Sequence, residues 1–175
     1  MNEYRWPVIA VAAIVVLALF FGFNYYRQHY LYQERFLEKL QEMEAIQSAA
    51  IKEENGAAVL EIIPAEDYRG SLKEMMDEIG AIAAAYGHAD QAVKLVDRRN
   101  QVLDSFAAAA SPALYEGARR NNYRSVAATI YELAETYRLE EVSFVVDSRH
   151  LYLQARDGDY YLYQVIPLEK QEGKI

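Results

Sequence analysis

The longest run of apolar residues in the chain lies near its N-terminus. Residues 7–23 (PVIAVAAIVVLALFFGF) carry no charged side chain. As a helix this run would extend about 26 Å, close to the roughly 30 Å of bilayer hydrocarbon. Trp6 precedes the run and Tyr25 and Tyr26 follow it, as aromatic residues do at membrane interfaces. The pattern predicts a single-pass transmembrane anchor over residues 7–26, after a short N-terminal tail of residues 1–6.

A cleaved signal peptide is the competing interpretation of this run. Such a peptide needs small residues before its cleavage site, whereas the run ends in residues 19–23 (LFFGF). We therefore expect an uncleaved signal-anchor. Arg27, Arg35 and Lys39 favour a cytoplasmic C-terminal domain, but long domains translocate largely regardless of flanking charge. Because a short tail before an anchor usually stays inside, we expect the domain outside the cytoplasm.

The next segment has a helical pattern. Residues 24–54 contain neither glycine nor proline, and Phe36, Leu40, Met43 and Ala50 follow one another at spacings of four, three and seven. We therefore predict a helical stalk over residues 27–55. Two heptads are too few to favour a stable coiled coil, so we expect a helix that packs on its own domain or spaces it from the anchor.

Residues 56–168 contain both helical and strand-like patterns of apolar residues, which predicts an α+β domain. The run 57–63 (AAVLEII) follows Asn55-Gly56 and precedes Pro64, which predicts one strand. Helical periodicity then predicts three helices, over residues 67–86, over 89–109 and from Ser111-Pro112 onward. Residues 169–175 are expected to form a flexible tail.

The last third of the domain has the period of strands. Residues 142–146, 151–155 and 160–166 alternate and predict a three-stranded antiparallel meander. Asp157-Gly158 is typical of a type I′ hairpin, which would pair Arg156 with Asp159, Leu153 with Leu162 and Tyr152 with Tyr163. One face would then point to the core (Leu151, Leu153, Ala155, Tyr160, Leu162), and the other would carry Tyr152, Gln154, Tyr161, Tyr163 and Val165. The predicted fold has helices against one side of this sheet.

Composition and charge exclude several classes of protein. Hydrophobic residues make up 53% of the chain and aromatic residues 13%, which is too rich for a disordered protein. The net charge of −8 disfavours nucleic acid as a partner. The absence of cysteine excludes disulfides, thiolate metal sites and a cysteine nucleophile. No Asn-x-Ser/Thr sequon occurs, so a bacterial cell envelope is the simplest location.

We find no catalytic, cofactor or metal motif in the sequence. His29, His88 and His150 are scattered, without the spacing that metal sites on a helix use. There is no Gly-x-Ser-x-Gly elbow, Walker loop or Gly-x-Gly-x-x-Gly. Carboxylates that could do acid/base work are present, but the sequence does not say which converge (Glu61, Glu66, Asp67, Glu140, Glu141). We expect a protein that is not an enzyme and holds neither cofactor nor metal.

Two groups of residues could bind a partner. The tyrosines Tyr152, Tyr161 and Tyr163 would form an aromatic face, with His150 nearby, unless the stalk or a helix covers them as a second core layer. The second group is basic and could bind an anionic polymer, a headgroup or an acidic partner (Arg119, Arg120 and Arg124, with Arg98 and Arg99). Its alternative is a solvated helix face with local ion pairs.

The expected function follows from the anchor and from the lack of catalytic motifs. We expect a non-enzymatic, membrane-anchored interaction or scaffold protein, a component of a bacterial cell-envelope assembly whose partners are the membrane and other envelope proteins. The alternative is a membrane-anchored sensing domain that binds a small molecule. A hydrolase built on converging carboxylates is a third hypothesis.

Overall fold

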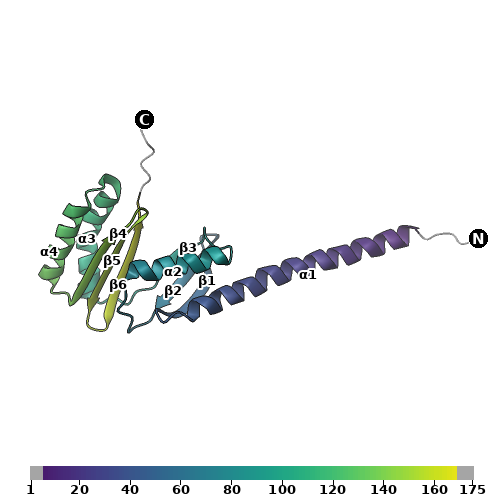
Figure 1. The fold of residues 1–175 in the computed structure, drawn as a ribbon, viewed down its shortest axis with the longest axis horizontal. Coiled ribbons are helices and arrows are strands. Elements are labelled where there is room, and N and C mark those ends of the chain that lie inside the picture. Colours follow the sequence, from purple (N-terminus) through teal and green to yellow (C-terminus); the bar gives the residue numbers. More distant parts are fainter. Residues whose placement is uncertain (1–5, 169–175) are drawn as a thin grey trace, which may run out of the picture.

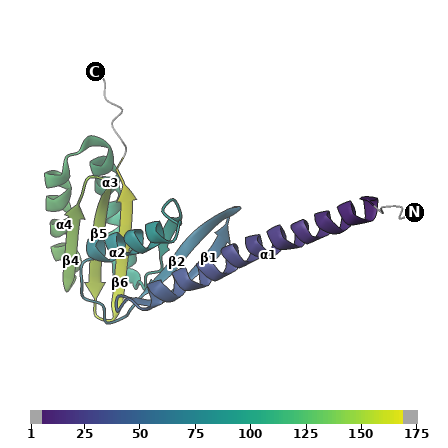
Figure 2. The same ribbon diagram turned by 45° about the vertical axis from the view of Figure 1, so that its right-hand side comes forward.

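The computed structural model describes residues 6–168; the predicted tail 169–175 and all but the last residue of the predicted tail 1–6 lie outside the described residues. Within the first helix, the side chains of residues 6–10, 12–13 and 23–32 also lie outside the description. Figures 1 and 2 show the arrangement. The elements are, in chain order, α1 (Trp6–Gln41), β1 (Ile46–Glu54), β2 (Ala57–Pro64), α2 (Leu72–Ala85), β3 (Ala92–Leu95), α3 (Gln101–Arg120), α4 (Tyr123–Tyr137), β4 (Glu141–Val146), β5 (His150–Asp157) and β6 (Tyr160–Pro167).

The strands form two separate sheets of three. In the N-terminal sheet the order is β1-β2-β3, with β1 antiparallel and β3 parallel to β2. Asn55 and Gly56 join β1 to β2 with φ angles of 54° and 79°, the two positive values that a type I′ turn requires. In the C-terminal sheet β4, β5 and β6 form an antiparallel meander. The fold is therefore α+β.

Apolar side chains cover both faces of the C-terminal sheet. On one face, α3 and α4 pack Phe106 and Ile130 against Leu153 and Leu162. On the other face lies a core that α1, α2 and the N-terminal sheet supply (Phe36, Leu40, Leu60, Ile62, Met75, Ile79). In Figure 1, α3 and α4 flank the C-terminal sheet on one side, while α2 and the N-terminal sheet lie on the other. The C-terminal sheet is the middle layer of the molecule.

The predicted transmembrane anchor over residues 7–26 is wrong. Among the residues that the structure describes, none of the helices combines the length and the apolar character that crossing a bilayer requires. A spanning helix needs roughly 20 consecutive apolar residues. The single-pass topology, the signal-anchor and the membrane localisation that rested on this segment are corrected with it.

The predicted fold class is also wrong in its strands and helix boundaries. The stalk helix expected over residues 27–55 ends at Gln41, and residues 46–54 form β1, because they pair along their whole length with β2. Phe36, Leu40 and Met43 are buried in the molecule's own core, so this helix packs on its own domain, the first of the two arrangements expected for it. The helix expected over residues 89–109 divides into β3 and the start of α3, whose N-cap is Asn100. Pro112 lies inside α3 and starts no new helix.

The hairpin between β5 and β6 has a different register from the one expected. Its two turn residues are Gly158 and Asp159; Gly158 has φ 59°, and Asp157 pairs with Tyr160. Glycine at the first central position is the mark of a type II′ turn. Leu153 consequently pairs with Gln164 and not with Leu162. Because the partner moves by two residues, an even number, each side chain keeps its predicted face. Tyr160, however, was expected in the core and is 38% exposed.

Candidate functional site

The two sheets meet edge to edge at a single point in the described chain. Arg98, just after β3, forms an isolated antiparallel bridge with Tyr161 of β6. The Arg98 N–H donates to the Tyr161 carbonyl at 3.1 Å, and the Tyr161 N–H donates to the Arg98 carbonyl at 2.7 Å. Next to this bridge, the Tyr163 N–H donates to the Asp97 carboxylate at 3.2 Å. Beyond this point β3 and β6 are unpaired edge strands.

A groove of about 630 Å³ opens where these two edges separate, and we call it the edge groove. This volume is within the range of small-molecule and peptide sites. One side of the edge groove is α2, which presents mostly small or apolar residues, and the strands supply the rest of the apolar lining (Met76, Ile79, Gly80, Ala83 and Ala84 of α2; Ala92 and Val93 of β3; Val165 and Pro167 of β6).

Main-chain groups of both edge strands are free to bind a ligand at the edge groove. In an antiparallel sheet, alternate residues of an edge strand point their N–H and C=O away from the neighbouring strand. The N–H and C=O of Tyr161 point away from β5 and bond to Arg98. Val165 follows four residues later, an even number, so its N–H and C=O also point away from β5, and they have no partner among the described residues. On the other side of the groove, the Val96 N–H donates to the Ile62 carbonyl of β2. Val93 lies three residues earlier, an odd number, so its N–H and C=O point away from β2 and toward the edge groove.

Polar side chains gather at one end of the edge groove. The Tyr152 hydroxyl donates to the Asp147 carboxylate at 3.0 Å and lies 3.3 Å from His150 Nδ1. Burial and the hydrogen bond to Asp147 raise the pKa of Tyr152 to about 12. Burial by itself would raise the pKa of Asp147, but the N–H groups of Arg149 and His150 and the Tyr152 hydroxyl donate to this carboxylate and lower its pKa. Tyr152 is therefore neutral, and Asp147 ionised, at neutral pH.

Two other polar groups at the edge groove have no side-chain hydrogen bond or ion pair among the described residues. The Gln91 side-chain oxygen is buried without a hydrogen-bond donor among the described residues. The Arg149 guanidinium also lines the edge groove and makes no ion pair within the described part of the chain. A buried acceptor without a donor is energetically costly, and a free guanidinium is suited to a carboxylate or phosphate. Both groups favour a polar ligand here.

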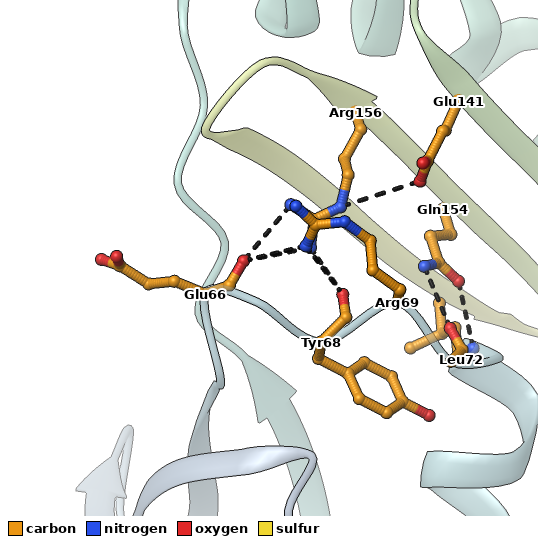
Figure 3. A network of polar contacts seen from close by, with 8 residues as sticks. Glu66, Tyr68, Arg69, Leu72, Glu141, Gln154 and Arg156 are labelled. Carbon is orange, nitrogen blue, oxygen red and sulfur yellow. Dashed lines mark hydrogen bonds and ion pairs between the residues drawn. The ribbon is translucent and has the colours of Figure 1, made fainter.

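A buried arginine contacts the segment that leads from β2 into α2, as Figure 3 shows. The Arg156 guanidinium donates to the carbonyl of Glu66 at 3.3 Å and to that of Tyr68 at 2.6 Å. Arg69 donates from outside to the same two carbonyls. Gln154 lies two residues before Arg156 on β5, on the same face of the sheet; it accepts from the Leu72 N–H and donates to the Gly70 carbonyl. These contacts fix the start of α2 and so the width of the edge groove.

The structure places the predicted aromatic face inside the protein. Tyr152, Tyr161 and Tyr163 are only 3–4% exposed and pack in the core between the two sheets. The alternative weighed for this face, a second core layer, therefore describes it. Of the group, Tyr152 alone lines the edge groove.

The basic residues do not form one cluster. Arg98 and Arg99 lie before α3, whereas Arg119 and Arg120 lie at its far end, about 30 Å away for a 20-residue helix. Arg98 pairs with Glu66 and Arg99 with Asp97. Arg120 pairs with Glu116 at 2.7 Å beside a shallow hollow that Arg119 also lines. Arg124 is exposed on α4. Most of these contacts are local ion pairs on a solvated surface.

The candidate carboxylates and histidines do not assemble a site in the described chain. Glu61 pairs with Lys52, and Glu141 approaches Arg156 at 3.9 Å. His88 stacks on Phe36 with ring centroids 4.5 Å apart, and the His29 side chain lies outside the described residues. No group of three metal-binding side chains occurs among the residues that the structure describes.

No protein family, curated protein or solved structure shows significant similarity to this chain. The geometry is therefore the basis for any functional inference. Of the residues that line the edge groove, the sequence analysis singled out Tyr152 and the nearby His150. It missed the groove itself, since its lining comes from α2, β3, β5 and β6 together. The one local signal was the run of small residues in α2, at positions 80–81 and 83–85.

Proposed function

We propose that this protein is a non-enzymatic interaction protein, a component of a larger assembly, and that α1 is the helix that docks on its partner. One observation carries the proposal. The apolar side chains between Ile14 and Phe21 are 50–67% exposed where they are large (Ile14, Val15, Val16, Leu17, Leu19, Phe20, Phe21). Figure 1 shows α1 projecting far from the sheets, so no other part of the described chain covers this segment.

The arrangement of these side chains indicates the chemistry of the partner. Consecutive residues of a helix are turned by 100°, so apolar residues at 14–17 and 19–21 point in all directions around the axis. A helix that is apolar on every side is normally buried on every side. A single partner helix would cover one side only. We therefore propose that the partner supplies several apolar helices that surround this segment of α1.

The other end of α1 supports a role in holding the domain in a fixed place. Phe36 and Leu40 are fully buried in the domain's own core. The same continuous helix therefore has one end exposed and apolar and the other end packed against the sheets, as Figure 2 shows for β1 and β2 beside α1. A partner bound to the first end would hold the sheets at a fixed distance.

The polar cluster of the edge groove favours binding over catalysis. A general base works best when its pKa lies near the operating pH. Tyr152, whose pKa is raised to about 12, remains protonated at neutral pH and donates to Asp147. Asp147 in turn accepts hydrogen bonds from the main-chain N–H groups of Arg149 and His150. Its carboxylate therefore stabilises the turn between β4 and β5.

Site-specific photo-crosslinking in living cells tests the proposal. A photoreactive phenylalanine analogue replaces Leu17 of α1 in the full chain, and Ala108, an exposed position of α3, serves as the control. We expect position 17, and not position 108, to crosslink to an apolar helical segment of another protein, and Leu19→Glu to reduce that crosslink at least tenfold. Crosslinks confined to copies of this chain, or equal crosslinks from both positions, would contradict the proposal.

A further inference from the structure

We infer that the edge groove takes an extended segment of a partner protein, which adds as a strand between β6 and β3 and places a carboxylate at Arg149. This surface is separate from the apolar end of α1, so the inference does not depend on the proposed docking of that helix. The edges of the two sheets share a backbone bridge only between Arg98 and Tyr161 within the described chain. An inserted strand would continue both sheets across the gap that opens beyond this bridge.

The main-chain groups of the edge strands are the first argument. The Val165 N–H and C=O point away from β5, and those of Val93 point away from β2, without partners in the described chain. Unpaired edges of this kind are templates for an added strand. Pro167, which has no N–H, limits the template at the open end of β6.

The shape of the α2 side is the second argument. Side chains of an extended peptide point alternately to opposite sides, so one set would face α2. There, apart from the backbone of α2 itself, nothing lies within 4 Å of the place where a Cβ on Gly80 would be, and its neighbours along the edge groove are Ala83 and Ala84. Small residues on this side leave room for the side chains of a bound strand.

The unpartnered polar groups are the third argument, and they define the chemistry of the segment. The buried Gln91 oxygen requires an N–H or O–H donor, which a peptide backbone supplies. The Arg149 guanidinium, free of ion pairs in the described chain, suits a carboxylate from an acidic side chain or a chain terminus. An apolar small molecule would fill the volume but would leave the buried Gln91 oxygen and the two strand edges without hydrogen bonds.

The test begins with random octapeptides displayed on phage and selected against the full chain. We expect selection of alternating sequences that contain Asp, Glu or a terminal carboxylate. Their Kd, measured by fluorescence anisotropy, is expected to rise at least tenfold with Arg149→Gln, and at least tenfold with Gly80→Leu, which fills the edge groove. The matched control is Glu78→Leu, an exposed position of α2 that does not line the edge groove; it should leave Kd unchanged.

Chemical variants of the selected peptide separate strand addition from other binding modes. Methylation of alternate backbone nitrogens keeps every side chain but removes the N–H donors, so it should abolish binding, whereas replacing the carboxylate by an amide should mimic Arg149→Gln. The inference is overturned if no peptide is selected, if Gly80→Leu has no effect, or if the methylated peptide binds as well as the parent. It is also overturned if decanoate competes for the edge groove as strongly as the selected peptide does.

Discussion

Arg156 is the one charged residue buried in the described core, at 2% exposure. The segment between β2 and α2 is not part of a sheet. Its main-chain carbonyls at Glu66 and Tyr68 accept hydrogen bonds from the Arg156 guanidinium instead. Such charge-assisted hydrogen bonds contribute more than neutral ones. Arg69 bonds to the same carbonyls from an exposed position, and exposed contacts contribute little. Two arginines thus share their acceptors but differ in burial.

We predict that Arg156→Met lowers the free energy of unfolding by about 2 to 4 kcal/mol, since buried carbonyls lose charged donors. Arg69→Met is the matched control and should change it by less than about 1 kcal/mol. Urea denaturation followed by circular dichroism measures both values. Equal losses from the two variants would show that burial of Arg156 is not what holds this segment.

Tyr152 makes a second prediction at the residue scale, about alkaline pH. Because its pKa is raised to about 12 in the folded protein, the folded state holds this proton more tightly than the unfolded state does. The stability that Tyr152 contributes is complete below pH 10, the ordinary value for tyrosine, and is lost as the pH rises toward 12. Tyr152→Phe should therefore make stability fall less steeply between pH 10 and 11.

The control for this titration is Tyr131→Phe. Tyr131 is 47% exposed on α4, so its removal should leave the slope of stability against pH as it is in the unmodified chain. Urea denaturation at a series of pH values provides the slopes. If Tyr152→Phe and Tyr131→Phe give the same slope, the bond between Tyr152 and Asp147 does not stabilise the fold in the way the structure indicates.

At the scale of elements, the helix pair α3–α4 depends on one close approach. A Cβ on Gly117 of α3 would lie 2.5 Å from Cγ2 of Val126 of α4. Val126 is buried and β-branched, so its side chain cannot turn aside. Gly80 of α2 is also inside a helix, but open space surrounds its missing Cβ. The two glycines therefore differ in packing and not in secondary structure.

We predict opposite effects of alanine at these glycines. Gly117→Ala should lower the free energy of unfolding by about 1 to 2 kcal/mol through overpacking. Gly80→Ala should raise it by about 0.5 to 1 kcal/mol, because alanine loses less conformational entropy in a helix interior. Thermal unfolding monitored by circular dichroism gives both shifts. A gain in stability from Gly117→Ala would show that Gly117 of α3 and Val126 of α4 are not in close contact.

Elements with a local signal could be predicted from the sequence, and elements made by distant pairing could not. The meander of β4, β5 and β6 alternates clearly and has a glycine turn, and it is present. β1 has two buried residues at helical spacing, Ile46 and Ala49, and it becomes a strand through pairing with β2. β3 is four residues long, too short for a periodic signal.

The edge groove could not be predicted for the same physical reason. Its two strand edges belong to different sheets, and its width depends on the contacts of Arg156 and Gln154 with the segment before α2. Neither relation leaves a pattern of local spacing. The tyrosine face, in contrast, was assigned to the correct side of the sheet; what local alternation could not show is that α1, α2 and the N-terminal sheet cover it.

At the scale of the whole molecule, the C-terminal sheet joins two apolar cores. Leu153 and Leu162 belong to the core with α3 and α4, while Tyr152 and Tyr163, on the same strands, belong to the core with α1 and α2. Because the two cores pack on opposite faces of this sheet, a loss of packing in one core removes support from the sheet on which the other core packs. α1 extends this arrangement outward, since its packed end belongs to the second core and its other end is exposed.

Two phenylalanines of α1 allow this division to be tested within one helix. Phe36 is fully buried, whereas Phe20 is 65% exposed. Phe36→Ala should lower the free energy of unfolding by about 3 to 5 kcal/mol, as large-to-small changes in a packed core do. Phe20→Ala should change it by less than about 0.5 kcal/mol, yet weaken the crosslink from position 17 to the partner. Urea denaturation and crosslinking of the same two variants separate folding from assembly. If Phe20→Ala destabilised the fold as much as Phe36→Ala, the exposed end of α1 would belong to the folded core, and its proposed role in assembly would fail.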